Sequence, residues 1–256
     1  MNLARNPKIQ LAITLFFIYL TSLFNNFSTQ NLLIFIISVV SCIISDLVFL
    51  RIGKKPMFFP SAALVIGLIL TLVVSPNLPL FAISIIGILA VVSKNFLRFN
   101  SRHIFNPAAF GLIIGSLFFE HTVSWWGVSS QQFRIQNLEF IIPFLILLSP
   151  GLISQYRIKR FRITLFFLVV YFIFQIIFNA KYFFDPTILF FSLVMLPEPM
   201  TTPNNHTRQI IFGTFIAVFS ILISFPIFHF LLLTFNSSDP LLLSLLIGNL
   251  IFFKLK

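Results

Sequence analysis

Ten apolar segments, joined by short polar connections, make up most of the chain. Their approximate bounds are 9–24, 32–50, 58–75, 78–95, 104–119, 138–154, 162–178, 183–197, 209–233 and 240–253. A transmembrane helix needs about 20 apolar residues, and several segments are shorter and begin or end at Pro. Charged residues make up only 9% of the chain, against about 25% of a soluble domain. The sequence predicts an all-α integral membrane protein with about ten transmembrane helices, some of them discontinuous.

The basic residues fall on alternate connections, which predicts how the segments cross the membrane. If the chain starts in the cytoplasm, fifteen of the 17 Lys and Arg residues share that side, and Arg134 and Lys181 lie on the other. Loops rich in Lys and Arg remain cytoplasmic. We expect an even number of spans in the plasma or inner membrane, with both termini cytoplasmic. The net charge of +11 does not indicate nucleic-acid binding, because these residues lie in short loops between apolar segments.

An internal repeat relates the two halves of the chain. Asn106–Phe119 aligns with Asp239–Phe252, and the match includes one Pro and one Gly at equivalent positions. Ten spans in two repeats give five spans each, and an odd number forces the halves into opposite orientations. We therefore expect a single membrane domain, 1–256, built from inverted repeats at about 1–120 and 138–256.

The most informative stretch begins at Asn106-Pro107, at the start of the fifth apolar segment. Asn is favoured as a helix N-cap and Pro at the first helical position. One interpretation is a half-helix whose N-terminal dipole faces a central site, suited to an anionic or carbonyl-bearing ligand; the other is plain capping at the membrane surface. The small residues that follow favour the first for Asn106. For the similar Asp239-Pro240, an exposed turn before it favours plain capping.

A second unusual run, Pro197–Pro203, reads Pro-Glu-Pro-Met-Thr-Thr-Pro. Its prolines exclude a regular helix, and a carboxylate at the end of an apolar segment is costly near hydrocarbon. Glu198, Thr201 and Thr202 are therefore candidate site residues. The alternative is a cytoplasmic turn in which Glu198 is solvated.

The remaining polar and aromatic residues do not form a recognisable functional motif. The single Cys and four scattered His residues give no spacing typical of a metal site, and no nucleotide-binding or nucleophile motif is present, so we predict no metal and no catalytic residue. Trp125 and Trp126 are expected to anchor at the membrane interface. Asp46 is expected to pair with Arg51 or Lys54.

Three stretches together resemble a known family. They are Ser61–Pro79, Lys94–Ala108, with its Phe-Asn-Pro-Ala, and Met195–Pro203, followed by Arg208–Gly213. They are similar to motifs of the RnfD/NqrB family, membrane subunits of ion-translocating ferredoxin:NAD and NADH:quinone oxidoreductases. The resemblance implies a fold of ten spans in two inverted five-helix repeats, like that of urea transporters.

The resemblance also implies a flavin cofactor. Family members carry FMN covalently bound to a Thr in an S-G-A-T motif of the outer loop after the fifth span, and some bind riboflavin noncovalently. Here that loop, residues 120–137, lacks S-G-A-T, and its single Thr, Thr122, lies in His-Thr-Val-Ser. We therefore expect FMN or riboflavin to be held without a covalent link.

These observations predict a membrane subunit of an electron-transport complex, coupled to ion translocation and associated with the lipid bilayer and with other electron-transport subunits. Alone it would be at most part of an oxidoreductase. Its cofactor site would combine Ser61, the Asn106-Pro107 half-helix, and Glu198, Thr201 and Thr202. The alternatives are a small-solute or vitamin transporter or channel on the same scaffold, and a structural membrane subunit without a ligand.

Overall fold

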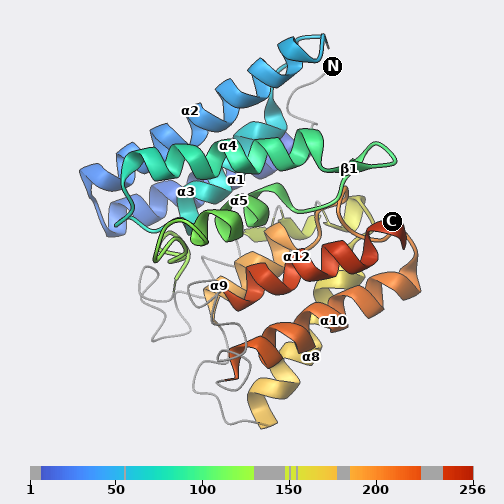
Figure 1. The fold of residues 1–256 in the computed structure, drawn as a ribbon. Coiled ribbons are helices and arrows are strands. Elements are labelled where there is room, and N and C mark those ends of the chain that lie inside the picture. Colours follow the sequence, from blue (N-terminus) through green and yellow to red (C-terminus); the bar gives the residue numbers. More distant parts are fainter. Residues whose placement is uncertain are drawn as a thin grey trace.

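The computed structural model describes residues 7–54, 56–129, 148–149, 151–153, 155–177, 185–225 and 239–255. Within these ranges the chain is almost entirely helical (Figure 1). Helices α1 (Pro7–Asn25), α2 (Thr29–Ile52) and α10 (His206–Ser224) are each long and apolar enough to cross a membrane. The predicted all-α membrane class is therefore confirmed.

The remaining elements are shorter. They are α3 (Ser61–Val73), α4 (Leu80–Phe96), β1 (Arg98–Phe99), β2 (Arg102–His103), α5 (Pro107–Ser116), α8 (Phe161–Ile177), α9 (Pro186–Phe190), the π-helix η2 (Phe191–Met195), α12 (Pro240–Phe252) and the 3₁₀-helix η4 (Phe253–Leu255). Strands β1 and β2 form a small antiparallel hairpin between α4 and α5. The predicted sixth segment, 138–154, lies mostly outside the described residues, so the total number of spans stays a prediction.

The predicted Asn-Pro and Asp-Pro helix starts are both present. Asn106 caps α5 by accepting a hydrogen bond from the Ala109 N–H at 3.1 Å, and Pro107 is the first helical residue. Asp239 caps α12 by accepting from the N–H groups of Leu241 and Leu242. Each cap supplies an acceptor for backbone N–H groups that have no partner inside the helix.

The helices pack as two groups that meet where α5 contacts α12 (Figure 1). In the first group α4 contacts both α2 and α5, and α3 contacts α1 and α2. In the second group α10 contacts both α8 and α12. The two helices that begin with Asn-Pro and Asp-Pro thus lie side by side at the junction of the groups.

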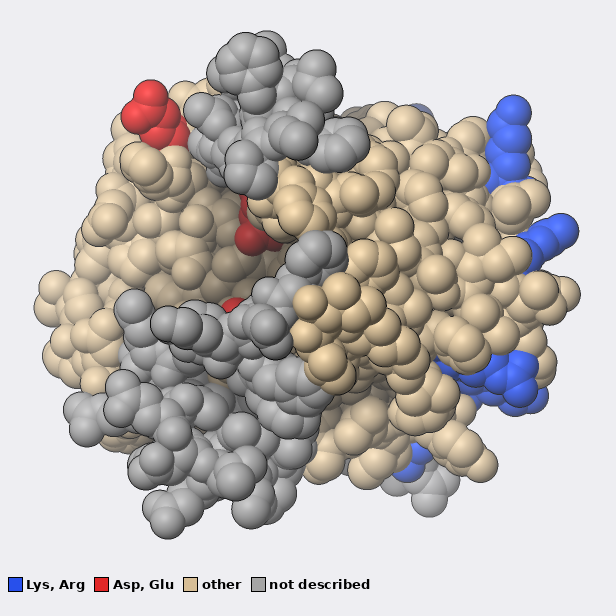
Figure 2. Space-filling model, turned by 90° about the horizontal axis from the view of Figure 1, so that it is seen from below, with Lys and Arg blue, Asp and Glu red and all other residues tan. Residues whose placement is uncertain are grey.

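Positive charge is concentrated at one end of the molecule. On the face shown in Figure 2, Lys and Arg side chains gather toward one edge. The β1–β2 hairpin and the two ends of the described chain lie at the same end in Figure 1. This arrangement agrees with the charge pattern of the sequence, whereas the side of the membrane that this end faces stays a prediction.

The segment after α5 folds back onto the C-terminal end of α3. The backbone N–H of Trp125 donates to the Val73 carbonyl at 3.1 Å, and Trp126 Nε1 donates to the Thr71 carbonyl at 2.7 Å. Both Trp residues are buried, with 6% and 8% of their surface exposed. The expectation that they anchor at the interface is wrong: they pack inside the protein and supply donors to carbonyls at the end of a short helix.

Gly111 lets α5 approach α4 closely. A Cβ at this position would lie 2.6 Å from the carbonyl oxygen of Ile86, a backbone atom that cannot rotate away. Overpacking costs roughly 1–3 kcal/mol, so we expect Gly111→Ala to lose free energy of unfolding near the upper end of that range, measured by thermal unfolding in detergent. Gly87→Ala is the matched control: its nearest contact is the Ser41 hydroxyl, which can turn away. Equal losses in the two variants would contradict this account of the α4–α5 contact.

Candidate functional site

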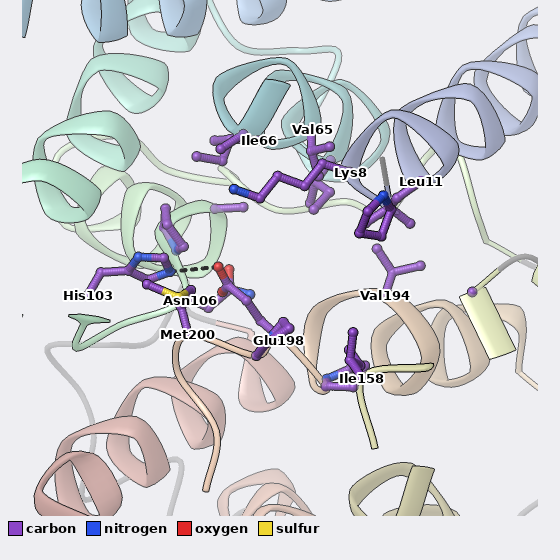
Figure 3. A pocket seen from close by; sticks show the side chains of 18 of the residues that line it. Lys8, Leu11, Val65, Ile66, His103, Asn106, Ile158, Val194, Glu198 and Met200 are labelled. Atoms are coloured by element: carbon purple, nitrogen blue, oxygen red, sulfur yellow. Dashed lines mark hydrogen bonds and ion pairs between the residues drawn. The ribbon is translucent and has the colours of Figure 1, made fainter. Parts of the chain in front are cut away.

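A cavity of about 270 Å³ lies among α1, α3, α5, η2 and the turn that follows η2 (Figure 3). Much of its wall is apolar, with Leu11 from α1, Val65 and Ile66 from α3, and Val194 from η2. Its polar side chains come from different elements. They are Lys8, Lys94, His103, Asn106, Gln155 and Glu198. The cavity therefore combines an apolar body with a limited number of polar groups, as small-molecule sites do.

Asn106 joins two elements at this cavity. Its side-chain oxygen caps α5, and its Nδ2 donates to the Met195 carbonyl at the end of η2, at 3.0 Å. The residue is 3% exposed, so both bonds are shielded from water. The two bonds fix the N-terminus of α5 against η2, although Met195 lies 89 positions further along the chain.

Pro197 explains why η2 needs partners from outside its own helix. Pro has no N–H, so the carbonyls four and five residues before it, those of Leu193 and Ser192, receive no helical donor from this position. Gln155 Nε2 donates to Leu193 at 2.8 Å, and the Thr164 hydroxyl donates to Ser192 at 2.7 Å. A π-turn is frequent at functional sites, and here it brings several side chains to the cavity end of the helix.

The side chain of Glu198 reaches from the Pro-rich turn to His103 in strand β2. Its Oε1 lies 2.7 Å from His103 Nε2 (Figure 3). Its other oxygen, Oε2, is buried and has no hydrogen-bond partner among the described residues. The interpretation of Glu198 as a merely solvated residue does not fit this geometry, because one oxygen is paired and the other is an unsatisfied acceptor at a cavity.

Comparison with known proteins identifies the scaffold. A sequence model described as the NQR2, RnfD, RnfE family matches residues 4–139, more than half of the 256-residue chain. The chain belongs to the NQR2, RnfD, RnfE family. No curated protein matches the chain. The matched span contains the Asn106-Pro107 helix start, whereas the Pro-rich turn at Glu198 lies beyond it, so the placement of both at one cavity comes from the structure.

In this NQR2, RnfD, RnfE family member, a buried ion pair adjoins the cavity. Lys94 Nζ lies 2.7 Å from Asp46 Oδ1, and Asn95 Nδ2 donates to the same oxygen at 3.2 Å. The Asp46 side chain is 3% exposed. The expected pairing of Asp46 with Arg51 or Lys54 is therefore wrong. Lys94 reaches Asp46 because α2 packs against α4.

Arg160 holds the turn that carries Glu198. Its guanidinium donates to the carbonyls of Pro199 and Pro203 and to the side-chain oxygen of Asn204. It is 4% exposed, and burial, aided by the nearby charge of Arg102, lowers its pKa to about 10. The group therefore stays protonated at neutral pH and fixes a segment whose prolines prevent helical hydrogen bonding.

Three of the predicted site residues do not line the cavity. Ser61 is the first residue of α3, and its neighbour Ala62 reaches the cavity instead. Thr201 and Thr202 are fully buried, and their hydroxyls donate to the Glu198 carbonyl at 3.3 Å and 2.7 Å. The two Thr residues shape the turn from within. Asn106, Pro107 and Glu198 are brought together in the lining, and their role in binding stays a prediction.

Gln155 is a cavity residue that was not predicted from the sequence. It is 1% exposed, lines the cavity and has an Oε1 without a hydrogen-bond partner among the described residues. Its orientation is fixed, because a flipped amide would place oxygen against the Leu193 carbonyl. In the sequence, Gln155 is recognisable only as an amide side chain at the end of an apolar segment. The spacing of residues does not show that it shares a cavity with Asn106 and Glu198.

Thr122 is the only Thr in residues 120–137, the loop in which the family resemblance would place a covalently bound FMN. Its hydroxyl donates to the Phe119 carbonyl at 2.7 Å, and the residue is 0% exposed. Its own carbonyl accepts from the N–H of Ser75 at 2.9 Å. A phosphoester at this hydroxyl would require the loop to open. This geometry agrees with the expectation of noncovalent flavin, which remains a prediction.

Proposed function

We propose that this chain is a membrane subunit of an Rnf/Nqr-type electron-transport complex, that it holds a flavin noncovalently in the cavity, and that the complex couples electron transfer to ion translocation. Family membership supports the role as a subunit. The observation that carries the cofactor proposal is the meeting of Asn106 and Glu198, from two motifs that resemble those of the family, at one cavity whose acceptors include two with no hydrogen-bond partner among the described residues.

The cavity suits one aromatic ring system better than a whole dinucleotide. Its volume of about 270 Å³ is slightly below the roughly 300–1,000 Å³ of typical ligand pockets. The apolar wall would contact ring faces, while Gln155 Oε1 and Glu198 Oε2 would accept hydrogen bonds from ring N–H groups. A bound flavin would supply one- and two-electron transfer. The residues of this chain would orient the ring and exclude water from it.

We further propose that the two halves of the chain are inverted repeats, as the sequence predicts, and the helix packing supports this. The order α2, α4, α5 in the first half matches α8, α10, α12 in the second, and in each half the middle helix contacts the other two. The two Pro-started helices then meet at the centre. With the basic end in the cytoplasm, as the positive-inside rule requires, the cavity lies on the cytoplasmic side, where partner subunits could deliver electrons.

Purification from native membranes in a mild detergent tests this proposal. We expect flavin absorbance and fluorescence to copurify with the chain and to be released completely on denaturation, since no covalent bond holds it. Gln155→Leu should weaken flavin binding roughly 5- to 150-fold, because a lost buried acceptor for a ring N–H costs roughly 1–3 kcal/mol.

Gln30→Leu is the matched control, because Gln30 Nε2 also donates to a backbone carbonyl, that of Leu78, but does not line the cavity. It should keep its flavin. Absence of flavin from the native preparation would contradict the proposal and favour the solute carrier. Flavin that stays with the denatured chain would contradict the noncovalent link.

A further inference from the structure

Basic and aromatic side chains from three elements meet beside the β1–β2 hairpin. The Phe99 ring in β1 packs edge-on against the Phe253 ring in η4, with 5.2 Å between the ring centroids. Lys254 Nζ lies 5.8 Å from the centre of the same Phe253 ring. Arg208, near the start of α10, donates to the Leu255 carbonyl at 3.1 Å. These contacts join the hairpin, η4 and α10 into one basic patch at the end of the molecule where the hairpin lies in Figure 1, and we define it by Arg98, Phe99, Arg208 and Lys254.

The three cations of the basic patch are accessible and contact only neutral groups. Arg98, Arg208 and Lys254 are all exposed. Arg98 Nη2 donates to the Ser101 carbonyl at 2.7 Å, Arg208 donates to a carbonyl, and Lys254 lies over an aromatic ring. Neither of the ion pairs found among the described residues involves any of the three. The basic patch therefore presents positive charge to whatever lies next to it.

The apolar outer faces of two helices lead to the basic patch. On α4, the large exposed apolar side chains are spaced so that they share one face of the helix, and they are Phe81, Ile85, Ile88 and Phe96. On α12, the last two turns expose Leu250 and Ile251. Short helix α5 contacts both α4 and α12. In a membrane protein, exposed apolar faces of this kind contact the acyl chains of lipids.

The cations lie where these apolar faces end. Lys254 follows Ile251 by three residues, which is about 5 Å along a helix that rises 1.5–2 Å per residue. Arg98 follows Phe96 by two residues, which is at most about 7 Å of extended chain. The headgroup region of a bilayer is roughly 5–8 Å thick on each side of the hydrocarbon. The cations are therefore at the level of lipid phosphates, and the exposed Phe99 ring beside them is of the aromatic kind common at that interface.

We propose that Arg98, Arg208 and Lys254 bind the headgroup of an anionic phospholipid whose acyl chains lie against the outer faces of α4 and α12. Basic side chains at a membrane surface attract anionic lipids, and Arg forms charge-assisted hydrogen bonds with phosphate oxygens. A zwitterionic headgroup also carries a cation, which these residues would repel, so the site favours a net negative headgroup. None of the three residues lines the cavity, so this site is separate from the proposed flavin site. A bound headgroup would hold the hairpin and η4 together.

Lipid titration of the whole chain tests this site. The chain in neutral detergent is titrated separately with phosphatidylglycerol and phosphatidylcholine, and the lipid-bound fraction is measured by native mass spectrometry. We expect phosphatidylglycerol to bind more tightly. Since each basic residue near an anionic headgroup contributes about fivefold in affinity, Arg98→Gln/Lys254→Gln should weaken phosphatidylglycerol binding roughly 25-fold and leave phosphatidylcholine binding nearly unchanged. Both residues are exposed, so the variant should keep the thermal midpoint of the native chain when no lipid is added.

Arg51→Gln/Lys54→Gln is the matched control. It removes the same charge from exposed positions at the end of α2, which lies at the same end of the molecule because Asp46 of α2 bonds Lys94 of α4. This variant should bind phosphatidylglycerol as the native chain does. The proposal is overturned if the native chain binds the two lipids equally, or if the Arg98/Lys254 variant keeps its phosphatidylglycerol. Equal weakening by the two double variants would also overturn it, because it would indicate a general attraction to positive charge.

Discussion

Asn106→Ala is expected to lower the free energy of unfolding by roughly 2–4 kcal/mol, the sum of a lost N-cap and a buried carbonyl left without a donor. The cap is the bond to the Ala109 N–H, and the abandoned acceptor is the Met195 carbonyl. Because these two bonds also fix α5 against η2, the same change should reduce copurified flavin. Thermal or denaturant unfolding in detergent, with flavin absorbance on the same sample, measures both effects.

Asn205→Ala is the control for the cap alone. Asn205 caps α10 by accepting from the N–H groups of Thr207 and Arg208, and it is exposed. Its loss should cost only about 1 kcal/mol and leave flavin content unchanged. If both Asn variants lose the same stability, the bond from Asn106 to Met195 contributes nothing, and the account of Asn106 as a joint between two elements fails.

Much of the local structure was predictable because it depends on neighbours in sequence. The helix starts at Asn106 and Asp239 followed from the physical preferences of Asn, Asp and Pro, which act within three residues of the cap. The irregular backbone after Pro197 followed in the same way, since a residue without an N–H cannot continue a helix. The membrane class followed from the low share of charged residues.

The sequence was less informative about which side chains would meet in the folded chain. Asp46 was expected to pair with Arg51 because the two are close in sequence, yet side chains on a helix face one another at three or four positions, not five. Thr201 and Thr202 were predicted to contact a ligand. In the structure their hydroxyls donate to the Glu198 carbonyl, as short hydroxyl side chains often do to nearby backbone carbonyls, and their role in binding stays a prediction. Gln155 was not predicted as a cavity residue, because its position at the cavity depends on how the helices pack.

The cavity itself illustrates the same division. Its motifs could be recognised in the sequence, but not that Glu198 would bond His103, which lies 95 positions earlier. Pro197 connects the local sequence with the tertiary contacts. Because Pro197 has no N–H, carbonyls of η2 need hydrogen-bond donors from other elements. Gln155 and Thr164 supply these donors. Local chemistry thus determined where partners were needed, and tertiary packing determined which residues supplied them.

Asp46→Leu is expected to lower the free energy of unfolding by roughly 3–5 kcal/mol, the usual cost of breaking a buried ion pair from one side. The change leaves Lys94 as a buried cation beside the cavity without its partner. Replacing both members of such a pair by apolar residues of similar volume is often neutral or stabilising. The double variant Asp46→Leu/Lys94→Met should therefore recover most of the loss, as measured by denaturant unfolding of the native chain and both variants.

The alternative is that Asp46 matters mainly through Asn95, which donates to the same oxygen. In that case Lys94→Met in the Asp46→Leu background would recover nothing, because the Asn95 amide, which also donates to the Val91 carbonyl, would lack its Asp46 acceptor in both variants. Recovery would instead identify the uncompensated Lys94 charge as the source of the instability. It would also show that the cavity wall tolerates an apolar side chain at position 94, so that flavin content in the double variant reports whether the ligand needs the ammonium group itself.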